Sequence, residues 1–421
     1  MVAATGFSRG AGWRGVLAAH AANLVGIGLS RFAYAPLIPA VIGAHWFLPS
    51  AAAYLGAANL AGYLAGALLA RRLAAWIATR VLLRAMMILA AVSFFACAEP
   101  LPFLWFFFWR FASGLAGGVL MALAAPTILP EVAPSRRGLA SGVIFAGVGL
   151  GIVASGTLVP LLLRSGLAAA WCGLGALALA LSALAWSAWP ADANYKSAAP
   201  AIRMVRQGPL LALYLEYALI AMALVPHMVF LVDFLARGLG HGIDDAAQIW
   251  VLYGIGAILG PMLAGAIADR IGFRYALRSA FAVQACAIAV VASMSDVPLL
   301  MASAFLVGGL TTGGVALVLG RVRELTGGQS EPQVAAWSIA TVSFAVGQAA
   351  SAYFYSFLFA EIGSYGLLFA FGAALAALAF AIDIASSRAL PGKEEDVRGR
   401  EPWHGGAREL DNKVPSGEHA P

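Results

Sequence analysis

An arginine deep inside an apolar segment is the residue of this sequence best suited to bind a charged ligand. Arg31 lies about 17 residues into the apolar run 14–42, and at 1.5 Å per helical residue this places it roughly 25 Å from the start. In a membrane span, an arginine at that depth costs about 2.5 to 3.5 kcal/mol, so its side chain has to face a cavity or a partner. Its charge and its fork of N–H donors match a carboxylate. We predict that Arg31 anchors an anionic substrate; the alternative is a structural arginine bonded to a neighbouring helix's carbonyls or to a buried acid.

Other polar residues recur around Arg31 at helical spacing. His20, Asn23, Ile27, Arg31 and Tyr34 are three or four residues apart, which places them on one face of a helix. We expect this face to line a cavity, with Asn23 and Tyr34 contacting the substrate beside Arg31.

Two titratable residues lie inside the apolar run 209–236. Glu216 and His227 are eleven residues apart, which is about 20° around a helix at 100° per residue. Burial and a charged partner can move the titration of either group. We predict that both are proton-coupling residues or balance the charge of Arg31, and that His227 also contacts the substrate. The alternative for Glu216 is that its side chain only snorkels to the membrane surface or pairs with Arg203 or Arg206.

Arg110 and Gln348 are two further candidates for substrate binding. Arg110 lies about two helical turns after the start of its apolar segment 101–126, where it supplies either a second positive group or an outer-gate ion pair with Asp233. Gln348 belongs to a polar stripe that is either a substrate contact or a contact between helices. With Arg31 and Arg110 set against Glu216, the charge balance favours a small organic anion or zwitterion.

The composition shows which elements must hold these residues. The chain has 421 residues, of which 62% are hydrophobic and 11% charged, whereas soluble proteins have roughly 25% charged residues. Twelve apolar segments cover residues 14–42, 51–70, 80–98, 101–126, 139–163, 167–189, 209–236, 246–268, 280–295, 297–320, 334–359 and 363–387. About 20 apolar residues span a bilayer as a helix. We therefore predict an all-α polytopic membrane protein with twelve transmembrane helices in two pseudo-symmetric six-helix bundles.

The longest internal polar stretch divides these segments into two equal groups. We predict an N-terminal bundle over 12–190, a cytoplasmic linker over 191–208, a C-terminal bundle over 209–388 and a disordered cytoplasmic tail over 389–421.

The positions of Lys and Arg predict the orientation of the chain. With both termini cytoplasmic, the inner connections hold Arg71, Arg72, Arg80, Arg84, Arg136, Arg137, Lys196, Arg203, Arg206, Arg270, Arg274, Arg278, Arg321 and Arg323. The outer connections hold only Arg164 and Arg237. The asymmetry indicates that both termini are cytoplasmic.

Short matches between the two halves indicate an internal repeat. Residues 66–72 resemble 265–270, and Phe145-Ala146 matches Phe344-Ala345, both at a separation of 199 residues. Such repeats are typical of transporters. A small-residue series in the fifth segment, Gly147, Gly151 and Ser155, is expected to pack between the halves.

Several segments resemble the major facilitator superfamily (MFS). Residues 265–274 read GAIADRIGFR, which is similar to the superfamily signature GxxxDRxGxR. The resemblance implies a gating loop formed by Asp269, Arg270 and Arg274. The equivalent first-half segment 66–72, GALLARR, has alanine where the signature has aspartate, so it lacks the residue of the usual N-terminal latch.

The chain also resembles one family within that superfamily, the YbfB/YjiJ family. The similarity lies in residues 28–39 (GLSRFAYAPLIP), 59–66 (NLAGYLAG), 145–151 (FAGVGLG) and 344–348 (FAVGQ). It implies a transporter that works by alternating access in the bacterial plasma membrane, and it implies no particular substrate.

Other functional classes lack their sequence signals. The chain contains no Walker A, HExxH or GxSxG sequence, so we expect no catalytic residues, no cofactor and no metal. Its basic residues sit in short runs between apolar segments, so we expect no nucleic acid partner. The expected partners are a small-molecule substrate, a proton as co-substrate and the lipid bilayer, around a monomer. The alternatives are a non-transporting sensor or assembly factor on a transporter fold, and a membrane-embedded enzyme.

Overall fold

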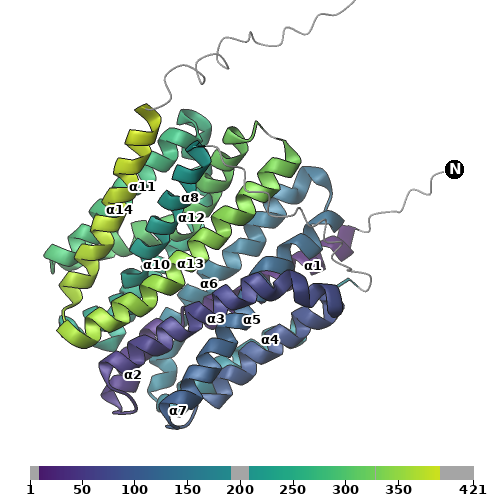
Figure 1. Cartoon of the computed structure of the whole chain (residues 1–421). Coiled ribbons are helices and arrows are strands. Elements are labelled where there is room, and N and C mark those ends of the chain that lie inside the picture. Colours follow the sequence, from purple (N-terminus) through teal and green to yellow (C-terminus); the bar gives the residue numbers. More distant parts are fainter. Residues whose placement is uncertain (1–8, 191–207, 328, 389–421) are drawn as a thin grey trace, which may run out of the picture.

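The computed structural model describes residues 9–190, 208–327 and 329–388, and in that part of the chain all regular structure is helical (Figure 1). The helices of the first half are α1 (Arg9–Asn23), η1 (Leu24–Leu29), α2 (Tyr34–Gly43), α3 (Pro49–Trp76), α4 (Thr79–Ala96), α5 (Phe103–Ile128), η2 (Leu129–Glu131), η3 (Pro134–Arg136), α6 (Arg137–Leu163) and α7 (Leu167–Ala185). Those of the second half are α8 (Gly208–Val225), η4 (Pro226–Phe230), α9 (Leu231–Asp233), η5 (Phe234–Gly238), α10 (Gly242–Ile271), α11 (Phe273–Ser293), α12 (Val297–Leu325), α13 (Ser330–Ile362) and α14 (Tyr365–Arg388).

Twelve helical stretches in the described residues are long and apolar enough to cross a membrane. The prediction of twelve transmembrane helices is therefore confirmed. Most of the predicted linker and all of the predicted tail lie outside the described residues; Gly208, the last residue of the predicted linker, begins α8.

Within each half, glycines let two helix backbones approach closely. A Cβ on Gly62 of α3 would lie 2.0 Å from the carbonyl oxygen of Phe111, and one on Gly256 of α10 would lie 2.1 Å from that of Phe305. Side chains larger than hydrogen cannot occupy such positions, so these glycines set the distance between α3 and α5 and between α10 and α12.

The same contacts give the register of the internal repeat. Gly256 follows Gly62, and Phe305 follows Phe111, by the same separation, since 256 − 62 and 305 − 111 both equal 194. Gly66 accordingly corresponds to Gly260, and not to Gly265 as the sequence match at 199 suggested. The repeat is present, but its register in these helices differs by five residues from the one read in the sequence.

The first and seventh spans are interrupted, which the sequence did not predict. In the first span, α1 passes into the π-helical η1, and α2 starts only at Tyr34 after a short break. In the seventh, η4 begins at Pro226, which has no N–H to continue an α-helical ladder, and η5 follows one turn later. The π-helical turns form often at functional sites, and one of them, η4, contacts α2 and α3 of the other half.

The two halves contact each other through α6 and α10 and through α3 and α13, and α2 also touches η4, α9 and α10. A Cβ on Gly156 of α6 would lie 2.9 Å from the carbonyl oxygen of Ala247 on α10. Nearer the face where the described chain begins and ends, Gly142 of α6 and Gly265 of α10 have no such neighbour within 4 Å. We call this face the terminal face. The two bundles meet at the face opposite to the terminal face and separate toward the terminal face, as the helix ribbons in Figure 1 also indicate.

The small-residue series of α6 does not act as expected. A Cβ on Gly147 would meet the carbonyl oxygen of His20, and one on Gly151 would meet Gly28. Both glycines therefore pack against the first span within their own half, Gly147 against the end of α1 and Gly151 against η1. Ser155 is at the interface as predicted and accepts a hydrogen bond from Trp250 Nε1 at 3.2 Å.

Candidate functional site

Arg31 lies in the break of the first span, between η1 and α2. Its Nη2 donates to Gln348 Oε1 on α13 at 2.6 Å and lies 3.7 Å from Met228 Sδ on η4. Its guanidinium carbon is 5.3 Å from the ring centres of both Phe32 and Tyr63. The side chain of a first-half residue is thus held by an amide and a thioether of the second half.

Arg110 stabilises the broken helix from α5. Its Nη1 donates to the carbonyl oxygen of Ser30 at 2.8 Å, and its guanidinium stacks 4.3 Å from the ring centre of Tyr34. Asn59 Nδ2 lies 3.3 Å from the same Ser30 oxygen, 3.2 Å from the carbonyl oxygen of Arg110 and 2.8 Å from Ser113 Oγ. The backbone carbonyl exposed by the π-helical turn is therefore satisfied by side chains.

A small cavity joins the two arginines. Its lining includes Arg31, Tyr34, Asn59 and Arg110 of the first half and Met228 and Val229 of the second. It has room for roughly one water molecule, so a larger ligand requires the two halves to move apart.

Neither arginine is neutralised by an acid. None of the ion pairs found between described residues includes Arg31 or Arg110, and no Asp or Glu lines the cavity. The Nε atoms of Arg31 and Arg110 are buried and lack a hydrogen-bond partner. Bulk water cannot replace that partner at Arg110, because the residue is only 3% exposed. The predicted alternative partner, Asp233, instead pairs with Arg237 at 2.5 Å and accepts a hydrogen bond from the hydroxyl of Tyr365 at 2.6 Å.

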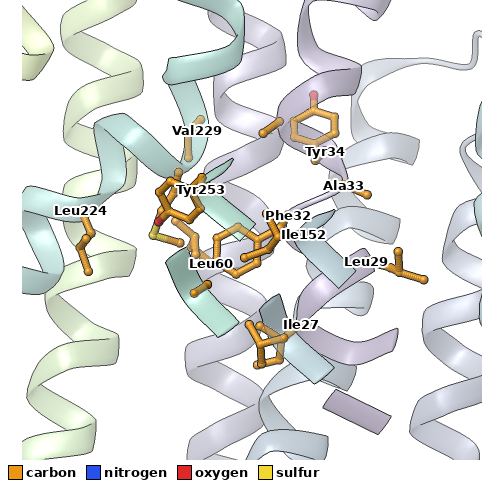
Figure 2. Close-up of a cluster of buried hydrophobic side chains, with 14 of the residues drawn as sticks. Ile27, Leu29, Phe32, Ala33, Tyr34, Leu60, Ile152, Leu224, Val229 and Tyr253 are labelled. Carbon is orange, nitrogen blue, oxygen red and sulfur yellow. The ribbon is translucent and has the colours of Figure 1, made fainter. Parts of the chain in front are cut away.

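Apolar side chains surround the break at this level. Figure 2 shows buried residues of both halves, among them Phe32, Leu60, Val229 and Tyr253, gathered between the helices. The rings of Phe32 and Tyr253 are 6.3 Å apart. Low-polarity surroundings strengthen the interaction of each guanidinium with an ionised ligand.

The structure brings some predicted residues together and separates others. Arg31, Tyr34, Arg110 and Gln348 meet at the cavity or beside it, and the Tyr34 hydroxyl donates to the carbonyl oxygen of Ala52 at 2.9 Å. Asn23 points to α6 instead, where Nδ2 donates to the carbonyl oxygen of Ile144 at 3.1 Å.

His20 bonds the same helix, with Nδ1 2.7 Å from the carbonyl oxygen of Val143. The prediction that His20 and Asn23 share one helical face with Arg31 is wrong, because the π-helical turn between them changes the helical phase.

The titratable pair of the seventh span lies inside the second half. His227 is fully buried, with Nε2 3.0 Å from Ser303 Oγ and its ring edge-on to Phe369 at 5.2 Å. It does not line the cavity. Glu216 is 3% exposed, and the charged groups that act on it are Asp383, Arg321 and Arg278. Arg203 and Arg206, its predicted alternative partners, lie outside the described residues.

The predicted gating loop connects α10 to α11 at the terminal face. Asp269 and Arg270 are exposed there, and Arg274 is half-buried, with its guanidinium 6.0 Å from the ring centre of Tyr275. In the first half, Ala70 is completely buried where the superfamily signature has aspartate.

The sequence did not single out Met228 or Asn59 as site residues. Met228 is an apolar residue in an apolar segment, and nothing in its neighbours indicates a hydrogen-bond acceptor. Asn59 carried a signal, since a buried amide within a span needs partners. Among the described residues, no group of three or more His, Cys, Asp or Glu side chains is placed to hold a metal ion.

Twelve membrane-length helices in two six-helix halves, with a cavity between the halves, are the architecture of membrane transporters of the major facilitator superfamily. A solved structure of a mutant of the nucleoside transporter NupG has the same fold, with a TM-score of 0.71 over 88% of this chain and 99% of that one, at 13% identity. The family model described as uncharacterised MFS-type transporter YbfB matches residues 23–384. The chain belongs to this family. No curated protein sequence matches it.

Proposed function

We propose that the protein is a secondary active transporter that moves a small organic anion or zwitterion across the plasma membrane by alternating access. The family and the fold are those of transporters, not of enzymes. The charges of the site support the proposed charge of the substrate.

The observation that carries this proposal is the pair of arginines beside the cavity, Arg31 and Arg110, with no acidic partner among the described residues. A buried charge without a counter-charge costs several kcal/mol. A ligand with a carboxylate supplies the counter-charge and accepts charge-assisted hydrogen bonds. Gln348 completes the site from the second half and holds Arg31 until the ligand arrives.

We assign proton coupling to Glu216. A buried carboxylate that gains a proton loses its Coulomb interactions with nearby charges, here those of Arg278, Arg321 and Asp383. Because α8 packs against α12 and α14, protonation of Glu216 changes the packing of the span that also carries Met228. His227 is the second candidate in this span.

In the proposed arrangement the terminal face is cytoplasmic in a bacterial inner membrane, and the protein works as a monomer. The loop with Asp269, Arg270 and Arg274 lies at that face and gates access from the cytoplasm.

A ligand screen on purified protein tests the substrate class. Organic acids, their neutral amides and amines of the same size are compared for their effect on the melting temperature. Acids that stabilise the protein are then tested for counterflow in proteoliposomes. We expect acids to stabilise and to be exchanged, and amides of the same size to do neither. Stabilisation by amines in place of acids would contradict the proposed substrate class.

A further inference from the structure

The cavity between the halves carries two fixed positive charges. Arginine stays protonated in proteins, and both Arg31 and Arg110 line this cavity without an Asp or Glu among its lining residues. The acid nearest in sequence to the second-half lining, Asp233, already pairs with Arg237. A ligand with one negative charge would leave one positive charge of the site unbalanced.

The two guanidinium groups are anchored separately. Arg31 is held by Gln348 and Met228 of the second half, whereas Arg110 is held by the Ser30 carbonyl and the ring of Tyr34. Each keeps a buried Nε that has no hydrogen-bond partner. Two separate donor groups suit two separate anionic groups better than a single one.

The contact of Arg110 with the broken helix does not require a charge. Asn59, a neutral amide, bonds the same Ser30 oxygen. The contact also uses one nitrogen of Arg110, and Nε remains without a partner. The ring of Tyr34 attracts the charge of Arg110 but does not neutralise it, so a ligand can still supply the counter-charge.

We propose that the substrate is a small dicarboxylate, with one carboxylate on Arg31 and the other on Arg110. The inference rests on the proposed transport of an organic anion and narrows it. The carboxylate at Arg31 takes the place of the Gln348 amide. Ile38, Leu60 and Val229 line the same cavity and contact the hydrocarbon spacer between the two carboxylates.

Matched ligands that differ by one charge test the proposal. Dicarboxylates of three to six carbons are compared with their monoamides and diamides, for example succinate, succinamate and succinamide, by calorimetric titration of the purified protein. We expect the best diacid to bind at least tenfold more tightly than its monoamide, and the diamide not to bind. Equal affinity of diacid and monoamide, or no binding of any diacid, would overturn the dicarboxylate assignment.

Two variants then locate the second charge. Arg110→Gln keeps a donor for the Ser30 oxygen and removes the charge, so diacid affinity should fall at least tenfold and the preference for the diacid over the monoamide should be lost. Arg110→Lys should retain the preference. A diacid preference that survives in Arg110→Gln would remove Arg110 from the site. If Arg110→Gln does not fold, the diacid preference of the wild-type protein and of Arg110→Lys still decides whether the site takes two carboxylates.

The failures of the two proposals are distinguishable. Monoamides and diacids that bind equally well leave the organic anion in place and reject only the second carboxylate. Diamides that bind as well as the diacids reject the organic anion itself.

Discussion

Arg31 is kept in the interior by an amide, a thioether and two aromatic rings, and not by a carboxylate. Such neutral partners stabilise a guanidinium less than an ionised acid does, so a ligand acid can displace them. A structural arginine is expected to have the opposite arrangement, with a protein carboxylate or several carbonyls fixed to it. The surroundings of Arg31 thus favour binding over the structural alternative.

Variants of Arg31 should show how much its charge and how much the fork of its N–H donors contribute to ligand affinity. Arg31→Lys keeps the charge and loses the fork, so ligand affinity should fall by about tenfold or more, since a charged hydrogen bond contributes about 1.5 to 3 kcal/mol. Arg31→Ala should eliminate binding while the protein still inserts in the membrane. Affinity and melting temperature are measured on the same preparations.

The exposed Arg164 provides the control for these variants, and Arg164→Ala should leave both quantities unchanged. Normal affinity in a destabilised Arg31→Ala protein would show that Arg31 is structural.

A variant of Glu216 should lose the proton driving force and keep substrate exchange. Glu216→Gln removes the ionisable group at a buried position, so accumulation driven by a pH gradient should stop while substrate exchange continues. Uptake into proteoliposomes with and without the gradient measures both. Glu99→Gln, at an exposed site, serves as the control, and gradient dependence that persists in Glu216→Gln would exclude Glu216 from coupling.

Among the elements, the interrupted first span decides where the site forms. Its break exposes the Ser30 carbonyl, and that carbonyl positions Arg110 through one hydrogen bond and Asn59 through another. Arg31 leaves the helix at the same break and reaches the second half. An uninterrupted helix would satisfy its own carbonyls and would give Arg110 no anchor at this depth.

Asn59 should therefore support both stability and binding. Asn59→Leu removes a side chain bonded to two carbonyls and Ser113, and we expect it to lower the free energy of unfolding by about 1 to 3 kcal/mol. Ligand affinity should fall as well, because Arg110 loses its neighbour. Gln284→Leu removes a single 3.4 Å hydrogen bond to Ile220 and should cost less; equal losses in the two variants would contradict this role.

Glycine contacts between elements predict a second difference in stability. A Cβ on Gly114 would lie 1.9 Å from the carbonyl oxygen of Asn59, whereas one on Gly142 meets nothing within 4 Å. Gly114→Ala should destabilise by at least about 1 to 3 kcal/mol through overpacking, and Gly142→Ala should be tolerated. Thermal unfolding in detergent compares them, and a stable Gly114→Ala protein would mean that α3 and α5 are not held this closely.

The number of spans was predicted correctly because a long apolar segment is a strong signal, but some predicted spans are shorter than the observed helices. The ninth span was predicted over 280–295 and is Phe273–Ser293, since Arg274 and Arg278 in its first turns hid its start. The breaks at η1 and η4 were missed, because a π-helical turn leaves hydropathy unchanged. Arg31 bonds Gln348, which lies 317 residues later in the chain. This contact depends on how the two halves pack, and the spacing of residues within one segment cannot predict it.

At the scale of the whole molecule, the halves touch at one face and part at the other. Contacts of α2 with α9 and α10 close the face away from the chain ends, while Gly142 and Gly265 face open space near the terminal face. The cavity beside Arg31 lies between these two levels, lined by residues of both halves.

The orientation of that face is open to a direct test. Reporter domains fused to the C-terminus and to the linker at residues 191–207 should report the cytoplasm, as the distribution of arginines requires. A reporter inserted at Gly166, in the turn between α6 and α7, should report the opposite side. A periplasmic signal from the linker would contradict the twelve-span topology in the cell.

The hydrogen bond between Arg31 and Gln348 has a kinetic consequence. In the proposed site it joins one half to the other only while no ligand is bound, because a bound carboxylate would take the place of the amide. In the proposed cycle the unloaded carrier must break this bond to reorient, whereas the loaded carrier has already lost it. Return of the empty carrier then limits net flux, so substrate on the far side of the membrane should accelerate uptake. Gln348→Ala should weaken that trans-stimulation by releasing the empty carrier.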